Sequence, residues 1–464
     1  MSEGRSIPKI NHLFEMIKTN SHLPTKISVV IPNHNGGAAL TRCLDAVQQS
    51  TYDNFECIVV DDGSTDDSPE RMRDAAIQVI ELRDGPHGPA HARNVGAQAA
   101  SGEIVLFLDA DVVIYPDTLR KVANAFSRVA GLTAVFGSYD DQPGDSHFLS
   151  QYKNLFHHFV HQQANENSSS FWSGCGAIRR EVFLDIGGFD TVKYPHPSIE
   201  DIELGRRLTA KGHKILIDKT IQVKHLKRWT LANLIRTDVF SRGIPWTQLV
   251  IADRKIPNDL NLESSQRWSA LFIGILLMFM TASTLFHRQV LLVPILLCLF
   301  WFILQCWQWE ESLPRFEMEW RSFLKLGVVF ALFTILALQL NLLNYLPSIL
   351  ILLGIVVIGP WLTRRSKFWR QAVFALMMIA IGVAMLEVVT TYPLWLTAFI
   401  FLLLGIFVLF NYNFYAFFKQ KRGVMFALAV MPFHMLYFLY SMLAFALGAL
   451  IYYKNSVLPF SSNR

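Results

Sequence analysis

The strongest constraint on the fold is the uneven distribution of charge along the 464-residue chain. Residues 269–464 contain 13 basic residues (Lys and Arg) and only 5 acidic residues, all of them glutamate. Residues 1–268 contain 29 basic and 32 acidic residues. The C-terminal part also consists of apolar runs close to the ~20 residues that cross a bilayer as a helix. The sequence therefore predicts a globular domain followed by membrane-embedded helices. This excludes a purely soluble enzyme, a disordered protein and a secreted disulfide scaffold.

About seven membrane spans are predicted from these apolar runs, near residues 269–286, 290–308, 326–345, 347–363, 371–390, 394–412 and 424–452. Lys and Arg cluster in three intervening segments, 309–325, 364–370 and 413–423, which the positive-inside rule assigns to cytosolic loops. Residues 1–20 lack the apolar core of a signal peptide. We therefore expect a multi-pass protein of the cell (inner or plasma) membrane whose N-terminal domain is cytosolic.

Residues 26–217 alternate short β-rich runs with helical stretches. Strands are predicted within 26–32, 55–64, 77–82 and 103–111, and helices within 40–49, 69–76 and 90–100. Continuous Val, Ile and Leu strands separated by helices favour an α/β domain with a mostly parallel, Rossmann-like sheet. Ligands of such sheets bind outside the carboxyl ends of the strands. Four aspartates fall at those ends: Asp61, Asp62, Asp109 and Asp111.

Several short motifs lie at the ends of these elements. Asp109 and Asp111 are separated by one small residue, and carboxylates so spaced can hold Mg²⁺ or Mn²⁺ while the ion bridges two phosphates. Asp61 and Asp62 can accept hydrogen bonds from a base or ribose. A run of small residues, Ser173, Gly174, Cys175 and Gly176, predicts a loop that lets backbone approach a ligand closely. Further motifs are IPNHN (31–35), ARN (92–94), GGFD (187–190), IED (199–201) and HLKRW (225–229).

This ordered set of motifs, over residues 26–229, resembles the family 2 glycosyltransferases, whose catalytic domain has the GT-A fold. The resemblance implies an inverting, metal-dependent transfer of a sugar from a UDP- or GDP-linked donor, with Mg²⁺ or Mn²⁺ as cofactor. Two positions depart from the family pattern. His34 stands where Tyr is usual, and His225 stands where Gln or Arg usually begins the xxRW element.

The resemblance also implies a role for each matching residue. Donor contacts are assigned to Pro32, Asn33, Asp61, Asp62, Arg93 and Asp109, and metal ligation to Asp109, Asp111 and His225. Asp201, which follows Glu200, is expected to be the general base that deprotonates the acceptor hydroxyl. Arg228 is expected to stabilise the diphosphate and Trp229 to wall the acceptor. The loop Ser173–Gly176 is assigned to the acceptor side.

Residues 229–268 mix Trp, Leu and Ile with Arg and Lys, which is typical of amphipathic helices in the membrane interface. The predicted organisation is thus an N-terminal extension (1–25), a glycosyltransferase domain (26–228), interface helices (229–268) and an all-α transmembrane domain (269–464). Because interface helices and spans directly follow the catalytic domain, a membrane lipid is the expected acceptor and the lipid bilayer an expected partner.

Two alternative functions remain open. One is a processive polysaccharide synthase, although such enzymes commonly have spans on both sides of the catalytic domain and a complete (Q/R)xxRW element. The other is a membrane scaffold or transporter with an inactive transferase domain, which would have no physical need for the DxD and ED acids. The modest basic excess lies beside apolar spans, so it indicates topology, and no nucleic-acid partner is expected.

Overall fold

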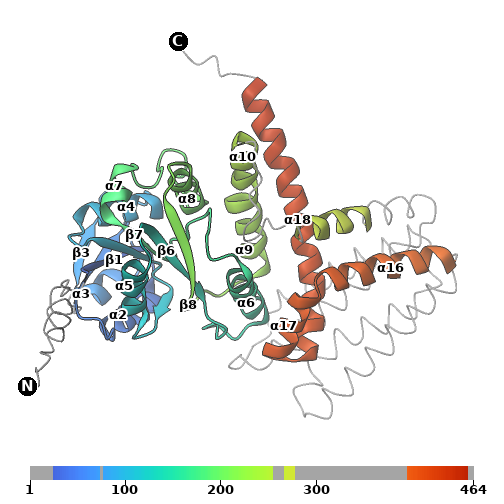
Figure 1. Ribbon diagram of the computed structural model, residues 1–464, viewed down its shortest axis with the longest axis horizontal. Coiled ribbons are helices and arrows are strands. Elements are labelled where there is room, and N and C mark those ends of the chain that lie inside the picture. Colours follow the sequence, from blue (N-terminus) through green and yellow to red (C-terminus); the bar gives the residue numbers. More distant parts are fainter. Residues whose placement is uncertain (1–24, 74–76, 254–265, 277–393, 458–464) are drawn as a thin grey trace, which may run out of the picture. The chain divides into compact units, whose positions relative to one another are not determined.

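The computed structural model describes residues 25–73, 77–253, 266–276 and 394–457 (Figure 1). The chain divides into two compact units. One comprises Met1–Ser138 and Asn165–Lys224, and the other comprises Tyr139–Ala164 and His225–Arg464. We call them the sheet unit and the helical unit. The sequence-based division differs from this one, because it assigned residues 139–164 to the glycosyltransferase domain.

The sheet unit is built on eight strands in the order β3-β2-β1-β4-β7-β6-β8-β5. Their bounds are β1 Ile27–Asn33, β2 Phe55–Asp61, β3 Gln78–Glu81, β4 Ile104–Leu108, β5 Val112–Ile114, β6 Leu132–Tyr139, β7 Cys175–Arg179 and β8 Lys214–His225. All five residues of β4 are buried, as expected for a central strand that is covered on both faces. The four predicted strands are confirmed as β1 to β4.

The pairing of the strands makes the sheet mixed. β1 pairs in parallel with β2 and β4, and β2 pairs in parallel with β3. β7 runs antiparallel to both β4 and β6. The predicted α/β class with a mostly parallel sheet is confirmed, and the antiparallel strand β7 is an addition that the sequence pattern did not indicate.

Helices connect the strands: α2 Gly37–Gln48, α3 Ser68–Arg73, α4 Pro89–Ala99, α5 Thr118–Arg128, α7 Arg180–Asp185 and α8 Glu200–Ala210. The three helices predicted in this region are confirmed as α2, α3 and α4. Helix α4 begins with Pro89, which suits the first helical position because its missing N–H has no intrahelical partner there. These connections place the ends of β2 and β4, with their aspartates, at the same edge of the sheet.

The helical unit contains α6 Phe148–Gln163, α9 Leu231–Arg236, a π-helix η1 Thr237–Gly243, α10 Ile244–Asp253, a helix over residues 266–276, α16 Leu394–Phe410, α17 Tyr412–Arg422 and α18 Val424–Val457. Helix α6 lies between β6 and β7 in the sequence. Its aromatic residues Phe148, Tyr152 and Phe156 recur every four positions and so share one face of the helix.

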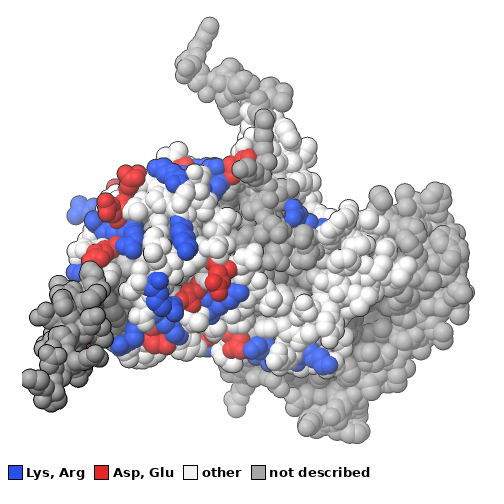
Figure 2. Space-filling view, viewed as in Figure 1, with Lys and Arg blue, Asp and Glu red and all other residues white. Residues whose placement is uncertain are grey.

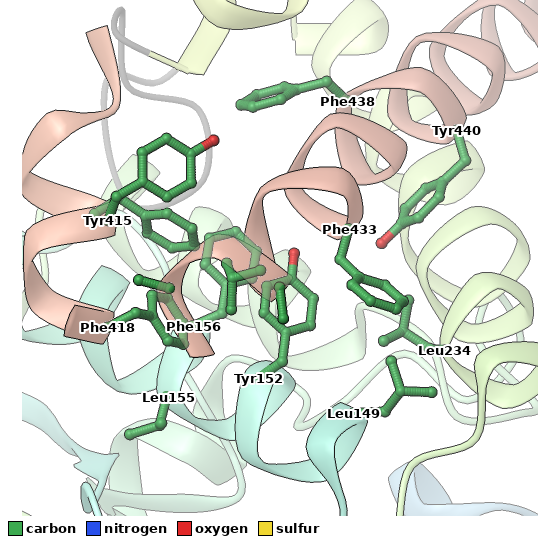
Figure 3. Packing of buried hydrophobic residues seen from close by; sticks show 14 of the residues in the cluster. Leu149, Tyr152, Leu155, Phe156, Leu234, Tyr415, Phe418, Phe433, Phe438 and Tyr440 are labelled. Atoms are coloured by element: carbon green, nitrogen blue, oxygen red, sulfur yellow. The ribbon is translucent and has the colours of Figure 1, made fainter. Parts of the chain in front are cut away.

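That aromatic face forms the centre of a buried cluster with the C-terminal helices (Figure 3). The ring of Tyr152 lies 5.7 Å from that of Phe433 and 6.1 Å from that of Phe418, measured between centroids. Phe156 packs edge-on against Phe414 at 5.3 Å. Each buried aromatic side chain contributes on the order of 2 kcal/mol of apolar burial, so this cluster explains why α6 belongs to the helical unit.

Within the described residues, one helix is long and apolar enough to cross a membrane, Val424–Asn455. A second candidate is the pair Leu402–Phe410 and Tyr412–Arg422, which meet at a bend of 70°. Two of the predicted spans, 394–412 and 424–452, thus fall on α16 and α18. The spans predicted at 290–308, 326–345, 347–363 and 371–390, and most of 269–286, lie outside the described residues.

The segment 413–423, predicted as a basic cytosolic loop, is mostly helical, because α17 occupies most of it, and its cytosolic location stays a prediction. Its Phe414, Tyr415 and Phe418 are buried. Three basic residues lie in its last turn, where positive charge favours the helix dipole. The prediction of a loop rests on these basic residues and does not take the aromatic residues of the segment into account.

Candidate active site

Arg93 joins two acidic motifs that are more than 90 residues apart in the sequence. From helix α4, one terminal nitrogen of its guanidinium donates to Oδ1 of Asp109 at 2.6 Å, and the other donates to Oε1 of Glu200 at 3.0 Å. The guanidinium also lies over the ring of Phe189, 5.8 Å from its centroid. The side chains of Arg93 and Glu200 are 5% and 6% exposed, so their ion pair is shielded from water, whereas the Asp109 side chain is 32% exposed. The DxD and IED motifs are thereby held at one place.

Asp201 lies in the first turn of α8 beside this ion pair. Its Oδ2 accepts hydrogen bonds from the backbone N–H of Ser173 at 3.0 Å and from the Ser173 hydroxyl at 3.1 Å. Burial, together with the charge of neighbouring Glu200, raises the pKa of Asp201 to about 6. A carboxyl group whose pKa lies near working pH can both accept and release a proton, as a general base must.

The predicted donor contacts around the nucleoside divide into two groups. Asn33 and Asp61 are both buried, and Asn33 Nδ2 donates to Oδ1 of Asp61 at 2.7 Å. The Ser64 hydroxyl donates to the same oxygen at 2.6 Å. Pro32 lies one residue earlier in β1, opposite Val60 of β2. Parallel pairing of β1 with β2 therefore brings the IPNHN and VDDGS motifs together, as the predicted donor site requires.

Asp62 has a different environment. Its two carboxylate oxygens accept from the backbone N–H groups of His87, at 2.8 Å, and Gly88, at 2.7 Å. Gly88 has φ +94°, and a Cβ there would lie 2.3 Å from the carbonyl oxygen of Pro195. The carboxylate thus fixes the 85–88 turn that leads into α4. The Gly and Pro residues of this segment indicate a turn, but no sequence pattern indicates that Asp62 accepts hydrogen bonds from its amides.

Two further motifs hold each other in place. The Asn94 side chain of the ARN motif donates to the carbonyl of Phe189 at 2.8 Å and accepts from its N–H at 2.9 Å. Gly188 has φ +65°, and a Cβ there would lie 2.5 Å from Asn94 Oδ1. Arg207 donates to the carbonyl of the same glycine at 2.6 Å. The GGFD turn is therefore anchored from α4 and α8, beside the Arg93 ion pairs.

The DxD residues follow β4 directly. The N–H of Asp109 donates to the carbonyl of Gly174 at 3.2 Å, and the side chains of Asp109 and Asp111 are half-buried. Two carboxylates are hard oxygen ligands of the kind that Mg²⁺ and Mn²⁺ bind, so these residues fit such an ion. In the part of the chain that the structure describes, no three His, Cys, Asp or Glu side chains are grouped as a metal site. His225 as third ligand stays a prediction.

The predicted loop Ser173–Gly176 is a loop over its first half only. Cys175 and Gly176 begin β7, where they face Leu108 and Phe107 of β4. A Cβ on Gly176 would lie 2.2 Å from the carbonyl oxygen of Trp172. The glycine is thus required by close packing of the chain on itself, whereas Ser173 and Gly174 hold Asp201 and Asp109.

The HLKRW residues lie in the helical unit. The ring of His225 stacks on Tyr139 at 4.3 Å between centroids, and its Nδ1 lies 2.6 Å from Asn154 Oδ1. Arg228 is exposed and donates to Nε2 of His147 at 2.9 Å. Trp229 is 4% exposed and belongs to the aromatic cluster. The roles predicted for these three residues stay predictions.

Residues 28–187 match the family described as Glycosyl transferase family 2. Over these residues, which lie on a mixed, mostly parallel sheet, the chain therefore matches the family that the motifs predicted.

Similar curated proteins are glycosyltransferases. The glycosyltransferase GlyG of Streptococcus pneumoniae serotype 4 is 31% identical over 129 residues, which are 26% of this chain and 42% of that protein. Validoxylamine A glucosyltransferase of Streptomyces hygroscopicus subsp. jinggangensis is 29% identical over 234 residues, 43% of this chain and 54% of that protein. The chain thus spans about half or less of the length of these relatives.

Solved structures give more distant likenesses. The mannosyltransferase PcManGT from Pyrobaculum calidifontis, in complex with GDP-Man and Mn²⁺, is 24% identical with a TM-score of 0.39, covering 50% of this chain and 66% of that one. S. aureus TarS 1–349 in complex with UDP-GlcNAc is 20% identical with a TM-score of 0.38, covering 49% and 66%.

Proposed function

We propose that this protein is a membrane-bound, inverting glycosyltransferase that moves a sugar from a UDP- or GDP-linked donor to a membrane lipid on the cytosolic face. The observation that carries the proposal is the double ion pair of Arg93 with Asp109 and Glu200. These ion pairs join Asp109, which is expected at the donor phosphates, to Glu200, which directly precedes the expected acceptor base Asp201. Such a junction is what a direct displacement needs, because both reactants must be held at one point.

In the proposed reaction, Asp201 takes the proton of the acceptor hydroxyl as its oxygen attacks the anomeric carbon from the face opposite the leaving group. The new C–O bond forms while the bond to the diphosphate breaks, and the electron pair of that bond stays on the diphosphate. The configuration is therefore inverted. General-base help of this kind is worth ~10²–10⁴ in rate.

The other residues hold the donor. Asn33 and Asp61 would bind the nucleoside, with Asp62 fixing the adjacent turn, and Arg228 would bind the diphosphate. Asp109 and Asp111, with His225, would hold Mg²⁺ or Mn²⁺. When bound, the cation would offset negative charge that develops on the diphosphate.

The proposed membrane location is supported by the exposed surface of the C-terminal helices. Large apolar side chains that are at least half exposed lie on α16 and α18, namely Leu402, Leu409, Phe410, Val424, Leu443, Phe445 and Leu450. Figure 2 shows blue and red side chains scattered over the sheet unit and a mainly white surface over these helices. An apolar surface of this extent is rare on soluble monomers and suits contact with lipid.

The test supplies membrane fractions from cells that express the protein with radiolabelled UDP-glucose, UDP-GlcNAc or GDP-mannose and extracts the lipids. Labelled lipid in the wild type, with a rate at least ~10²-fold lower in Asp201→Asn, supports the proposal. Labelled polymer would instead support the processive synthase, and no product with any donor would support the inactive scaffold. Excess EDTA should abolish transfer, and full activity in EDTA would overturn the metal requirement.

A further inference from the structure

Ser173 and Gly174 form a short bridge between the two reaction centres of the proposed site. Ser173 donates twice to Asp201, and Gly174 accepts from the N–H of Asp109. The bridge is rigid on one side, since β7 begins at the next residue and pairs with β4. Ser173 is 3% exposed, so water does not compete effectively for its hydrogen bonds.

The hydrogen bonds of Asp201 distinguish its two oxygens. Oδ2 accepts both bonds from Ser173, whereas Oδ1 accepts one bond, from the backbone N–H of Ile202 at 2.8 Å. An ionised carboxylate offers about four acceptor sites, two on each oxygen. By these hydrogen bonds, both acceptor sites of Oδ2 are occupied, and one of the two acceptor sites of Oδ1 is occupied. The second site of Oδ1 is the one that a substrate hydroxyl can use.

We propose that Ser173 is a positioning residue for the base, which directs Oδ1 of Asp201 to the acceptor hydroxyl by occupying Oδ2. This inference rests on the proposed function and adds the atom that takes the proton. During transfer the proton moves from the acceptor oxygen to Oδ1, and Ser173 keeps its own proton throughout. Glu200 and Arg93 are the other charged groups beside Asp201, and both engage in the ion pair described above.

The test compares Ser173→Ala, Ser173→Thr, Asp201→Asn and the double variant Ser173→Ala/Asp201→Asn in the full-length protein in membranes, with the labelled donor that gives lipid product. Ser173→Ala should lower kcat ~10-fold or more, while the KM for the donor stays unchanged, because loss of the hydroxyl leaves one acceptor site of Oδ2 empty and the base is aligned by its two backbone hydrogen bonds alone. The acid limb of the pH–rate profile should move to higher pH, since the ionised carboxylate loses a hydrogen bond.

Three comparisons decide the outcome. Ser173→Thr keeps the hydroxyl and should restore most of kcat and the wild-type pH profile. In the Asp201→Asn background, Ser173→Ala should cause no further loss, because the two residues act as one unit. Ser168→Ala, a buried serine of the same segment, is the matched control and should leave kcat unchanged.

A wild-type kcat and pH profile in Ser173→Ala, with turnover of Asp201→Asn at least ~10²-fold lower, would overturn this inference and leave the proposed function intact. Additive losses in the double variant would also overturn it. Absence of lipid product from the wild type, or full activity in Asp201→Asn, would overturn the proposed function itself.

Discussion

Lys153 and Asp238 form a buried ion pair across 85 positions of the chain, with Nζ of the lysine 2.6 Å from Oδ2 and 2.8 Å from Oδ1 of the aspartate. The hydroxyl of Tyr440 donates to Oδ2 of the same carboxylate at 2.7 Å. One carboxylate on η1 therefore joins α6 to α18. Asp238 sits in the π-helix η1, a helix type that is rare and is found frequently at functional sites.

We predict that Asp238→Ala destabilises the protein by ~3–5 kcal/mol, because Lys153 is left buried without its partner. Thermal unfolding of the detergent-solubilised protein measures this loss. The control is Arg128→Ala, which breaks a pair 3.5 Å long whose arginine is 69% exposed and should cost at most ~1 kcal/mol. Equal shifts in the two variants would contradict the assigned role of the buried pair.

A second prediction concerns Asp62. Asp62→Ala should raise the KM for the donor and open the 85–88 turn to proteolysis, since two amides lose a charged acceptor worth ~1.5–3 kcal/mol each. Limited proteolysis and initial rates measure the two effects. Asp53→Ala removes an exposed carboxylate from the same domain and should leave both unchanged. A raised KM without increased cleavage would instead indicate direct donor contact.

The third prediction separates the two adjacent acids. Asp201→Asn should cut turnover by at least ~10² with donor binding nearly unchanged, because the loss falls on the transition state. Glu200→Gln should be milder, since Glu200 is engaged by Arg93 and by the N–H of Ser198 at 2.9 Å. Turnover numbers and donor affinity are measured for both. Near-normal turnover in Asp201→Asn with severe loss in Glu200→Gln would reassign the base to Glu200.

The fourth prediction concerns how stability depends on pH, which follows from the pKa of Asp201. A carboxyl pKa raised from 3.8 to about 6 means that the folded protein holds this proton more tightly than the unfolded chain. Stability is therefore lost as pH rises from about 4 to about 6 and stays lower above that range. Asp201→Asn lacks this penalty, so its melting temperature should exceed that of the wild type at pH 8. The difference should vanish near pH 4, and a constant difference would refute the linkage.

The fifth prediction concerns topology. Lys421 of α17 pairs with Asp141 at 2.6 Å, and Arg422 donates to the carbonyl of the same aspartate at 2.9 Å. In the proposed membrane arrangement, the end of α17 and the segment that precedes α6 therefore lie on the same side. A cysteine at position 421 should escape a membrane-impermeant thiol reagent in intact cells and react after permeabilisation. Position 288 lies between the predicted spans 269–286 and 290–308, on the side opposite the predicted cytosolic segment 309–325. A cysteine there is the control that should react in both.

The sheet was predictable from the sequence because its central strands are buried on both faces. Runs such as IVLFL in β4 leave few alternatives to a covered strand. β7 was not predicted, because CGAIR is short and its glycine and cysteine carry little strand signal. The position of β7 in the sheet follows from its pairing with β4, in which Cys175 lies opposite Leu108. These two residues are 67 positions apart in the sequence, and no local pattern encodes such a contact.

The residue types of the candidate site were predictable, and their partners were only partly so. Asp109 and Asp201 stood out as acids at the ends of elements. Asp62 looked equivalent to Asp61, yet its oxygens are filled by amides 25 and 26 positions further along the chain. A carboxylate that binds backbone and one that binds ligand have the same sequence signature, so only the fold distinguishes them.

The position of α6 between two strands of the sheet has a practical consequence for protein production. A fragment that ends at Lys224 would retain α6 but lose its aromatic partners Phe418, Phe426 and Phe433. The face formed by Phe148, Tyr152 and Phe156 would then be solvent-exposed, and such fragments should aggregate during expression. A water-soluble fragment of the sheet unit therefore needs two changes to the gene, a stop after Lys224 and replacement of residues 139–164 by a short polar linker.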